Sequence, residues 1–148
     1  MFGLVSNAAK TVTEVKKELN LPSILESVDK AASEAEIFAR SNGFDNGALF
    51  AIDMAVREAV ANAVKHGNKL DDTKIVEITF INLNKGLEVI VRDFGEGFEV
   101  EEVPDPTNPE NLLKANGRGV LFMKTFMEEV EWANHETGGM IVKMCKLR

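Results

Sequence analysis

The spacing of apolar residues changes near the middle of the chain, and this change restricts the fold more than any other feature. Between residues 22 and 66, apolar side chains recur at three- and four-residue steps, which predicts two helices separated by a Ser-Asn-Gly breaker at residues 41–43. From residue 74 the period becomes two. Segments 74–83 and 87–93 flank an Asn-Lys-Gly turn and predict a β-hairpin. Such a chain is expected to pack its helices against a sheet.

The remaining segments complete an α+β pattern. Residues 14–20 alternate weakly and predict a first strand, and residues 129–134 and 140–147 predict two closing strands. An acidic loop is expected over residues 99–110, followed by a short apolar helix over about 119–127. The order β, α, α, β, β, loop, α, β, β predicts a two-layer α/β sandwich. Its helices would pack on one face of a mixed, mostly antiparallel sheet.

The composition is typical of a soluble globular protein and restricts the partners. The 148 residues, 45% of them hydrophobic, are expected to form a single domain over residues 1–148, with a flexible segment at residues 1–13. No apolar run is long enough to cross a bilayer and no signal peptide is recognisable, so no membrane partner is expected. The net charge of −7 argues against nucleic acid as a partner. A single cysteine, Cys145, predicts a cytoplasmic protein without an internal disulfide.

The helix predicted over residues 46–66 carries a line of polar residues among small apolar ones. Glu58 and Asn62 are four residues apart and emerge one turn apart on one face, and His66 continues the line. Such a carboxylate can orient or deprotonate a hydroxyl, and the amide oxygen can ligate Mg²⁺ beside phosphate oxygens. A solvated helix edge is the alternative, with His66 favoured simply by its place at a helix C-terminus. Gly67 is expected to end the helix in a left-handed conformation.

The segment after the hairpin, Asp93 to Phe98, contains a carboxylate and two glycines. Asp93 shares its strand face with the apolar row of residues 87–91, so it is expected to point into the core, where an amino group of a ligand would satisfy it. Gly95 and Gly97 would let that ligand lie against bare backbone. The alternative is a glycine turn in which Asp93 caps backbone amides.

A third segment places Gly117, Arg118 and Gly119 before the short apolar helix. Free amides at a helix N-terminus, beside an arginine, can form a phosphate cradle. A plain connecting loop is the alternative.

Together these three segments resemble a known family in order and spacing. E-x-x-x-N on a helix, D-x-G-x-G after a strand and G-x-G before a helix are similar to the N, G1 and G2 boxes of the GHKL, or Bergerat-fold, ATPases. The resemblance runs from about residue 14 to the end of the sequence. The phrases REAVANAVKHGN, VRDFGEGF, DPTNPENLL and GRGVLFMKTFMEEVEW look most like the bacterial anti-sigma-factor serine/threonine kinases.

The resemblance implies a role for each matching residue. Glu58 would be the general base, Asn62 the Mg²⁺ ligand and Asp93 the acceptor of the adenine amino group. Gly95 and Gly97 would make room for the base, and Gly117 and Gly119 would belong to the lid over the phosphates. Arg118 is placed among the nucleotide-binding residues on its chemistry, because a guanidinium beside the lid could touch a phosphate. Many relatives carry a threonine where this chain has Met140, so weaker nucleotide affinity is predicted.

The function implied is transfer of the γ-phosphoryl group of Mg-ATP to a serine or threonine of a small antagonist protein. Sequestration of a sigma factor or an equivalent partner and a homodimeric state are implied as well. A nucleotide-dependent partner-binding module with little or no transfer is the alternative, and the intact Glu58 favours the kinase. The catalytic domain of a histidine kinase could serve only in trans, since no upstream helix with an acceptor histidine is expected.

Overall fold

The computed structural model describes residues 15–96 and 123–148 of the chain. Within these residues, two long helices and five strands follow the order expected from the sequence. The helices are α2 (Glu26–Ser41) and α3 (Asn46–Asn62), and the strands are β1 (Val15–Pro22), β2 (Ile75–Asn82), β3 (Gly86–Arg92), β4 (Glu129–Asn134) and β5 (Met140–Leu147). Residues 123–126 form a further helical turn. The N-terminal segment 1–13 and the acidic loop 99–110 lie outside the described residues.

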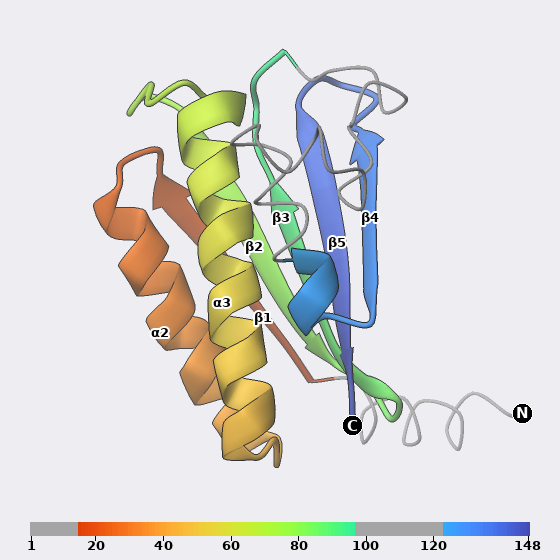
Figure 1. Cartoon of the computed structure of the whole chain (residues 1–148). Helices are drawn as coiled ribbons and strands as arrows, with labels where there is room; N and C mark the ends of the chain where they lie inside the picture. The colour runs from red at the N-terminus through yellow and green to blue at the C-terminus, as the bar shows by residue number, and fades with distance from the viewer. Residues whose placement is uncertain (1–14, 97–122) are drawn as a thin grey trace, which may run out of the picture.

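The five strands form one sheet in the order β1-β2-β3-β5-β4. All four neighbouring pairs are antiparallel, so the expected mixed sheet is antiparallel throughout its described strands. The β2–β3 hairpin pairs Phe80 with Val89 and Ile78 with Val91, which places the two apolar rows side by side. β5 pairs with β3 on one side and with β4 on the other, so β4 forms the edge of the sheet opposite β1 (Figure 1).

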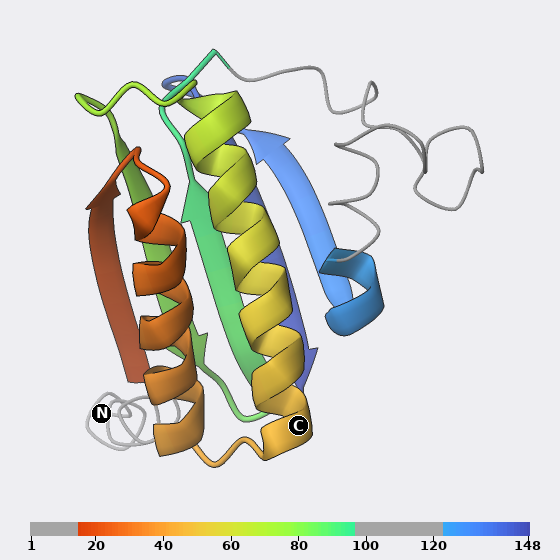
Figure 2. The ribbon, with the colours of Figure 1, turned by 60° about the vertical axis from the view of Figure 1, so that its left-hand side comes forward.

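Both long helices cover the same face of this sheet (Figure 1, Figure 2). α2 packs over β1 and β2, while α3 packs over β3 and β5. The side chains that alternate toward the helices are buried together with one stripe of α3, and they form the core: Ile52, Val56, Val60, Val76, Ile78, Phe80, Leu87, Val89, Val91, Val142 and Met144. The expected two-layer sandwich is confirmed, and its driving force is the burial of these two apolar surfaces against each other.

The C-terminal end of α3 differs from the expectation. The helix continues as a π-helical turn, Ala63–Gly67, and Gly67 does not adopt a positive φ. The left-handed residues are instead Lys69 and Leu70, with φ of 54° and 60°. Gly67 is required for a different reason: a Cβ atom at this position would overlap the carboxylate of Asp93. The prediction for Gly67 was therefore wrong, because close approach to another segment decides this position.

Candidate active site

The C-terminal end of α3, the end of β3 and the start of β5 meet at one end of the sheet (Figure 1). Asp93 follows β3 there and is buried, with 5% of its surface exposed. Its Oδ1 accepts hydrogen bonds from the N–H groups of Gly95 (3.0 Å) and Met140 (3.1 Å). Among residues 15–96 and 123–148, no donor reaches Oδ2. The inward position expected for Asp93 is confirmed, and it also caps a backbone amide, as the alternative proposed.

Burial raises the pKa of Asp93 above the ordinary value of an aspartate. Hydrogen bonds from the Gly95 and Met140 amides oppose this rise by stabilising the charged form. The positive charges of Lys74 and Arg92 act in the same direction, but desolvation remains the largest effect. A ligand that donates a hydrogen bond to Oδ2 would therefore relieve a charge that the fold leaves only half satisfied.

Three glycines from different segments crowd the backbone around Asp93. A Cβ on Gly67 would overlap Asp93 Oδ2, one on Gly95 would overlap the Gly67 carbonyl oxygen, and one on Gly139 would overlap the Asp93 carbonyl oxygen. The backbone segments are in direct contact, so a side chain at any of the three positions would push them apart. Sequence reasoning selected Gly95 but missed Gly67 and Gly139, which resemble ordinary helix and turn stops.

Asn68 is a buried residue of this region that sequence reasoning also missed. It is 2% exposed, and its Nδ2 donates to Ser23 Oγ (2.7 Å) and to the Ile75 carbonyl oxygen (2.9 Å). Its Oδ1 accepts from the N–H of Phe94 (2.8 Å), the residue after Asp93. The only sequence signal was an asparagine directly after the helix-ending glycine, which is also typical of a simple turn.

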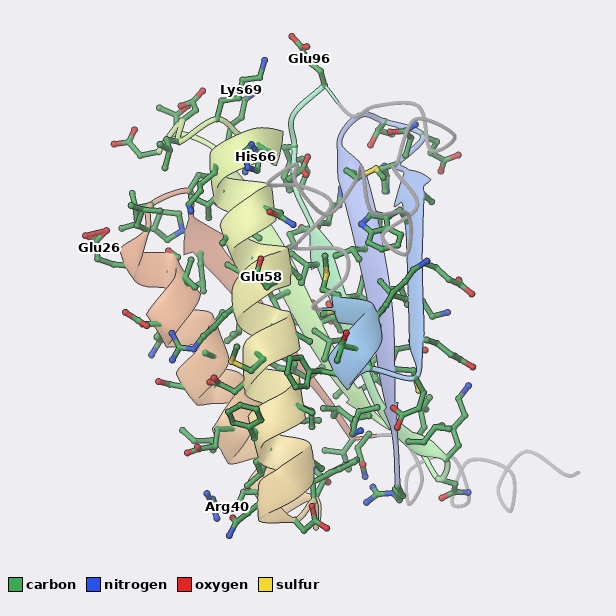
Figure 3. All side chains as sticks on the ribbon, in the orientation of Figure 1. Glu26, Arg40, Glu58, His66, Lys69 and Glu96 are labelled. Carbon is green, nitrogen blue, oxygen red and sulfur yellow. The ribbon has the colours of Figure 1, made fainter. Side chains whose placement is uncertain are left out.

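The polar line of α3, formed by Glu58, Asn62 and His66, makes no polar contacts with the described residues. Glu58 and Asn62 are half-buried, and neither side chain makes a hydrogen bond or ion pair with the described part of the chain. Figure 3 shows Glu58 midway along α3 and His66 nearer the end where Glu96 follows β3. His66 is exposed, and its ring makes no hydrogen bond or ion pair with that same part of the chain. The expected line of side chains is present, and its polar atoms are available to a ligand.

The opposite flank of α3 is engaged by its neighbour. Arg57 donates to Asp29 of α2 (2.5 Å) and to Asp53 one turn earlier on α3 (3.0 Å). These ion pairs join the two helices on the flank adjoining α2. The polar residues of α3 thus divide into a structural side at Arg57 and a free side at Glu58 and Asn62.

The turn before β5 places Met140 against Asp93. The Asp93 N–H donates to the Met140 carbonyl oxygen (3.0 Å), the Met140 N–H donates to Asp93 Oδ1, and the Met140 side chain is buried. The Thr137 hydroxyl of the same turn accepts from Arg92 Nη2 (3.1 Å) and lies 2.8 Å from His135 Nδ1. That hydroxyl is therefore used on the exposed side of the turn.

Several expected site features lie beyond the described residues: Gly97, Gly117, Arg118 and Gly119. Within residues 15–96 and 123–148, no three His, Cys, Asp or Glu side chains gather to hold a metal ion. A Mg²⁺ ion held by one amide oxygen and by phosphate oxygens needs no such cluster, and the half-buried Asn62 fits that type of site.

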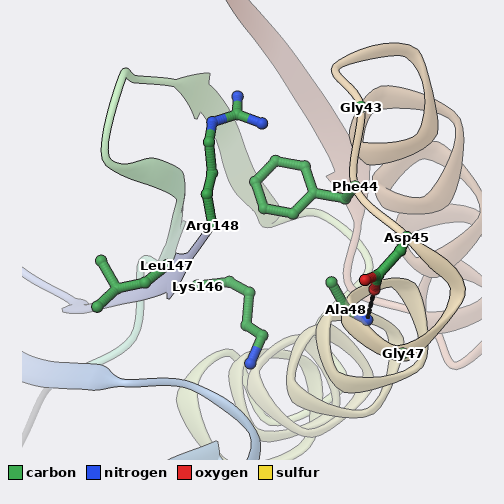
Figure 4. Close-up of a pocket in the computed structure, with 8 residues that line it drawn as sticks. All are labelled: Gly43, Phe44, Asp45, Gly47, Ala48, Lys146, Leu147 and Arg148. Atoms are coloured by element: carbon green, nitrogen blue, oxygen red, sulfur yellow. Dashed lines mark hydrogen bonds between the residues drawn. The ribbon is translucent and has the colours of Figure 1, made fainter.

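A cavity of about 430 Å³ lies at the opposite end of the sandwich (Figure 4). It is lined by the loop between α2 and α3 and by the end of β5, and Asp45 caps α3 there by accepting from the N–H of Ala48 (2.9 Å). None of the residues selected from the sequence lines it.

The described helices include none that is long and apolar enough to span a membrane.

Comparisons with known proteins agree with this architecture. The chain is 36% identical over 101 residues to the serine-protein kinase RsbW of Bacillus subtilis, a match that covers 64% of this chain and 62% of that protein. It is 36% identical over 102 residues to the anti-sigma F factor of Anoxybacillus flavithermus, with 66% and 68% covered. The chain thus spans less than two thirds of the first relative and slightly more than two thirds of the second.

A solved structure shares the fold. The RsbU and RsbW domains of a Mycobacterium tuberculosis protein superpose with a TM-score of 0.67 over 90% of this chain and 32% of that chain, at 16% sequence identity. The sequence model of the histidine kinase-like ATPase domain family matches residues 21–146. The chain therefore belongs to the family of histidine kinase-like ATPase domains, as the resemblance of its three boxes implied.

Proposed function

We propose that this protein is an ATP-dependent serine/threonine kinase that phosphorylates a small antagonist protein and sequesters a sigma factor or an equivalent partner. The observation that carries the proposal is the free line of Glu58 and Asn62 on α3, on the same helix whose end contacts the buried Asp93. The names of the relatives, serine-protein kinase and anti-sigma F factor, support it.

Each side chain has a distinct task in this proposal. The free Oδ2 of Asp93 accepts a hydrogen bond from the amino group of adenine, while Gly95 and Gly97 leave room for the base. Gly117, Arg118 and Gly119 contribute to the phosphate lid. The Asn62 amide oxygen holds a Mg²⁺ ion, which when bound neutralises charge on the phosphate oxygens.

Glu58 acts on the acceptor hydroxyl. The acceptor oxygen bonds to the γ-phosphorus, and the bond from that phosphorus to the leaving ADP oxygen breaks. The Glu58 carboxylate takes the hydroxyl proton in the same step. Its half-buried position, without a cationic partner in the described residues, leaves it available to accept this proton.

The partners and the assembly state are part of the proposal. By analogy with the anti-sigma-factor kinases, the protein acts in the cytoplasm as a homodimer, which light scattering of the purified protein would detect.

Because Met140 stands where many relatives carry threonine, the ATP affinity of this protein is expected to be lower than theirs. Direct titration of Met140→Thr checks this expectation, which fails if the variant binds no more tightly.

The decisive experiment uses Mg-ATP labelled at the γ-phosphate, the purified protein and candidate antagonist proteins from the same genome. Label is expected on a serine or threonine of one antagonist. Glu58→Gln is the matched control: it has the same shape, should bind ATP normally, and should transfer at least about a hundredfold more slowly. Tight ATP binding without transfer to any antagonist would instead favour a partner-binding module, and transfer by Glu58→Gln at the normal rate would refute the role of Glu58.

A further inference from the structure

Asn68 joins three separate parts of the chain beneath the proposed adenine site. It follows the π-helical turn at the end of α3, and its own N–H donates to the Ala63 carbonyl oxygen (2.8 Å). The backbone of Asn68 is therefore fixed to α3, while its side chain reaches away from the helix. This placement allows the carboxamide to connect the end of α3 to neighbouring segments by hydrogen bonds.

Two of the side-chain hydrogen bonds hold the carboxamide itself. Nδ2 donates one hydrogen bond to Ser23 Oγ (2.7 Å) and another to the Ile75 carbonyl oxygen (2.9 Å). Ser23 is fully buried, and its hydroxyl in turn donates to the Lys74 carbonyl oxygen (2.7 Å). Both donors of Nδ2 are used, so the carboxamide has one orientation, with Oδ1 directed at the opposite side.

The third bond reaches the segment that carries Asp93. Oδ1 of Asn68 accepts from the N–H of Phe94 (2.8 Å), between Asp93 and Gly95. Arg92 also contacts this segment, with its guanidinium carbon 4.1 Å from the centre of the Phe94 ring. Arg92 holds the ring, however, and Asn68 holds the backbone amide. Of these two contacts, only the one from Asn68 engages the backbone next to Asp93, and it adds to the hydrogen bonds that Gly95 and Met140 make with Asp93.

We propose that Asn68 is a positioning residue for base recognition: its bond to the Phe94 amide sets the orientation in which Asp93 presents its free oxygen to the ligand. The proposal rests on the proposed role of Asp93 as acceptor of the adenine amino group. Without the Asn68 carboxamide, the Phe94 N–H would lack its hydrogen-bond acceptor, and the segment could rotate. Asp93 would then discriminate poorly between bases, whereas the phosphate contacts of α3 would be unaffected.

The test compares the affinities for Mg-ATP and Mg-ITP by titration calorimetry. ITP carries a carbonyl oxygen in place of the amino group and a proton on N1, so the ATP-to-ITP ratio reports on recognition of the base edge that Asp93 would contact. Asn68→Ala is expected to lower the ATP-to-ITP affinity ratio about tenfold, as expected for loss of one well-placed hydrogen bond. Ser27→Ala is the matched control, because it removes another buried hydrogen bond near the start of α2, to the Pro22 carbonyl oxygen (2.7 Å), without a link to Phe94.

An unchanged ratio in a folded Asn68→Ala protein would overturn the proposal, as would an equal loss in Ser27→Ala. If Asn68→Ala does not fold, Ser23→Ala removes one of the two acceptors that orient the carboxamide, and a fall of about twofold to threefold is expected. No fall in that variant overturns the proposal. The experiment requires no phosphoryl transfer. If the protein discriminates ATP from ITP but transfers no phosphoryl group, the kinase proposal is refuted and this inference is retained. If the wild-type protein does not discriminate between them, this inference is refuted.

Discussion

The two polar regions of the site differ in how completely the fold satisfies them. The Asp93 cluster, which comprises Asp93, Gly67, Asn68, Gly95 and Met140, is in close contact, and its side-chain N and O atoms are hydrogen-bonded within the described residues except for Asp93 Oδ2. The Glu58–Asn62 line, one to two turns earlier on α3, is half-buried and makes no polar contact with the described residues.

This difference indicates that the two regions are organised by different means. The Asp93 cluster is preorganised, because a buried carboxylate without its amide donors would strongly destabilise the fold. The Glu58–Asn62 line makes no such contacts within the described residues, so its geometry depends on the helix alone. Variants in the two regions should therefore separate effects on stability from effects on chemistry.

The largest effect on stability is expected from Gly67→Ala. The added methyl group would overlap the Asp93 carboxylate, so the free energy of unfolding should fall by about 2–3 kcal/mol and ATP binding should be lost. Gly47→Ala is the matched control in the first turn of the same helix, where a Cβ would lie an ordinary 3.5 Å from Asp45 Oδ1. It should stabilise the protein by up to about 1 kcal/mol. Urea denaturation measures both, and similar values would contradict the interlocked geometry.

Asp93→Asn is expected to affect binding far more than stability. The amide oxygen can still accept from Gly95 and Met140, but a donor replaces the free Oδ2 and would face the adenine amino group. Loss of a charged hydrogen bond of about 1.5–3 kcal/mol corresponds to roughly tenfold to a hundredfold weaker ATP binding. Calorimetry checks this affinity, and thermal melting should show no loss of stability because a buried charge has been removed. Unaltered ATP affinity would argue against Asp93 as the base acceptor.

A smaller effect is expected from pH, with opposite signs for folding and binding. Because burial raises the pKa of Asp93, its contribution to stability is fully present below the unfolded pKa and is lost as pH rises through the folded pKa. In the proposed function, ATP binding needs the charged carboxylate, so affinity should decrease as pH falls through that raised pKa. Titrations of ATP across acidic pH measure this decrease. Asp93→Asn should lack this component, and an identical profile in wild type and variant would assign it to another group.

The smallest effects on stability are expected in the Glu58–Asn62 line. Glu58→Gln neutralises and Asn62→Ala truncates a side chain that contacts no polar partner in the described residues, so each should change the free energy of unfolding by no more than about 0.5 kcal/mol. Asn62→Ala should also weaken the dependence of ATP affinity on Mg²⁺. Melting curves with and without Mg-ATP test both points, and a large loss of stability in the absence of nucleotide would show that this line is structural.

Local patterns in the sequence were sufficient for the architecture. Alternation along β2 and β3 has a period of two residues, so it identifies the buried face without knowledge of the partner strand, and it correctly predicted that Asp93 points inward. The same applies to the apolar stripe of α3 and to the line of Glu58 and Asn62, which depend only on helical geometry.

The contacts around Asp93 could be decided only by the tertiary structure. Gly67 matches a common helix-ending signal, yet its role comes from a carboxylate 26 residues away in the chain, and Asn68 bonds to Phe94 across the same separation. Neither residue carries a periodic signal, because each position is set by one close approach between segments. The sequence by itself determined which elements form and which faces they bury. The packing of α3 against the end of β3 decided which glycine and which asparagine support the site, since hydrogen bonds and steric overlap depend on distances that local patterns do not encode.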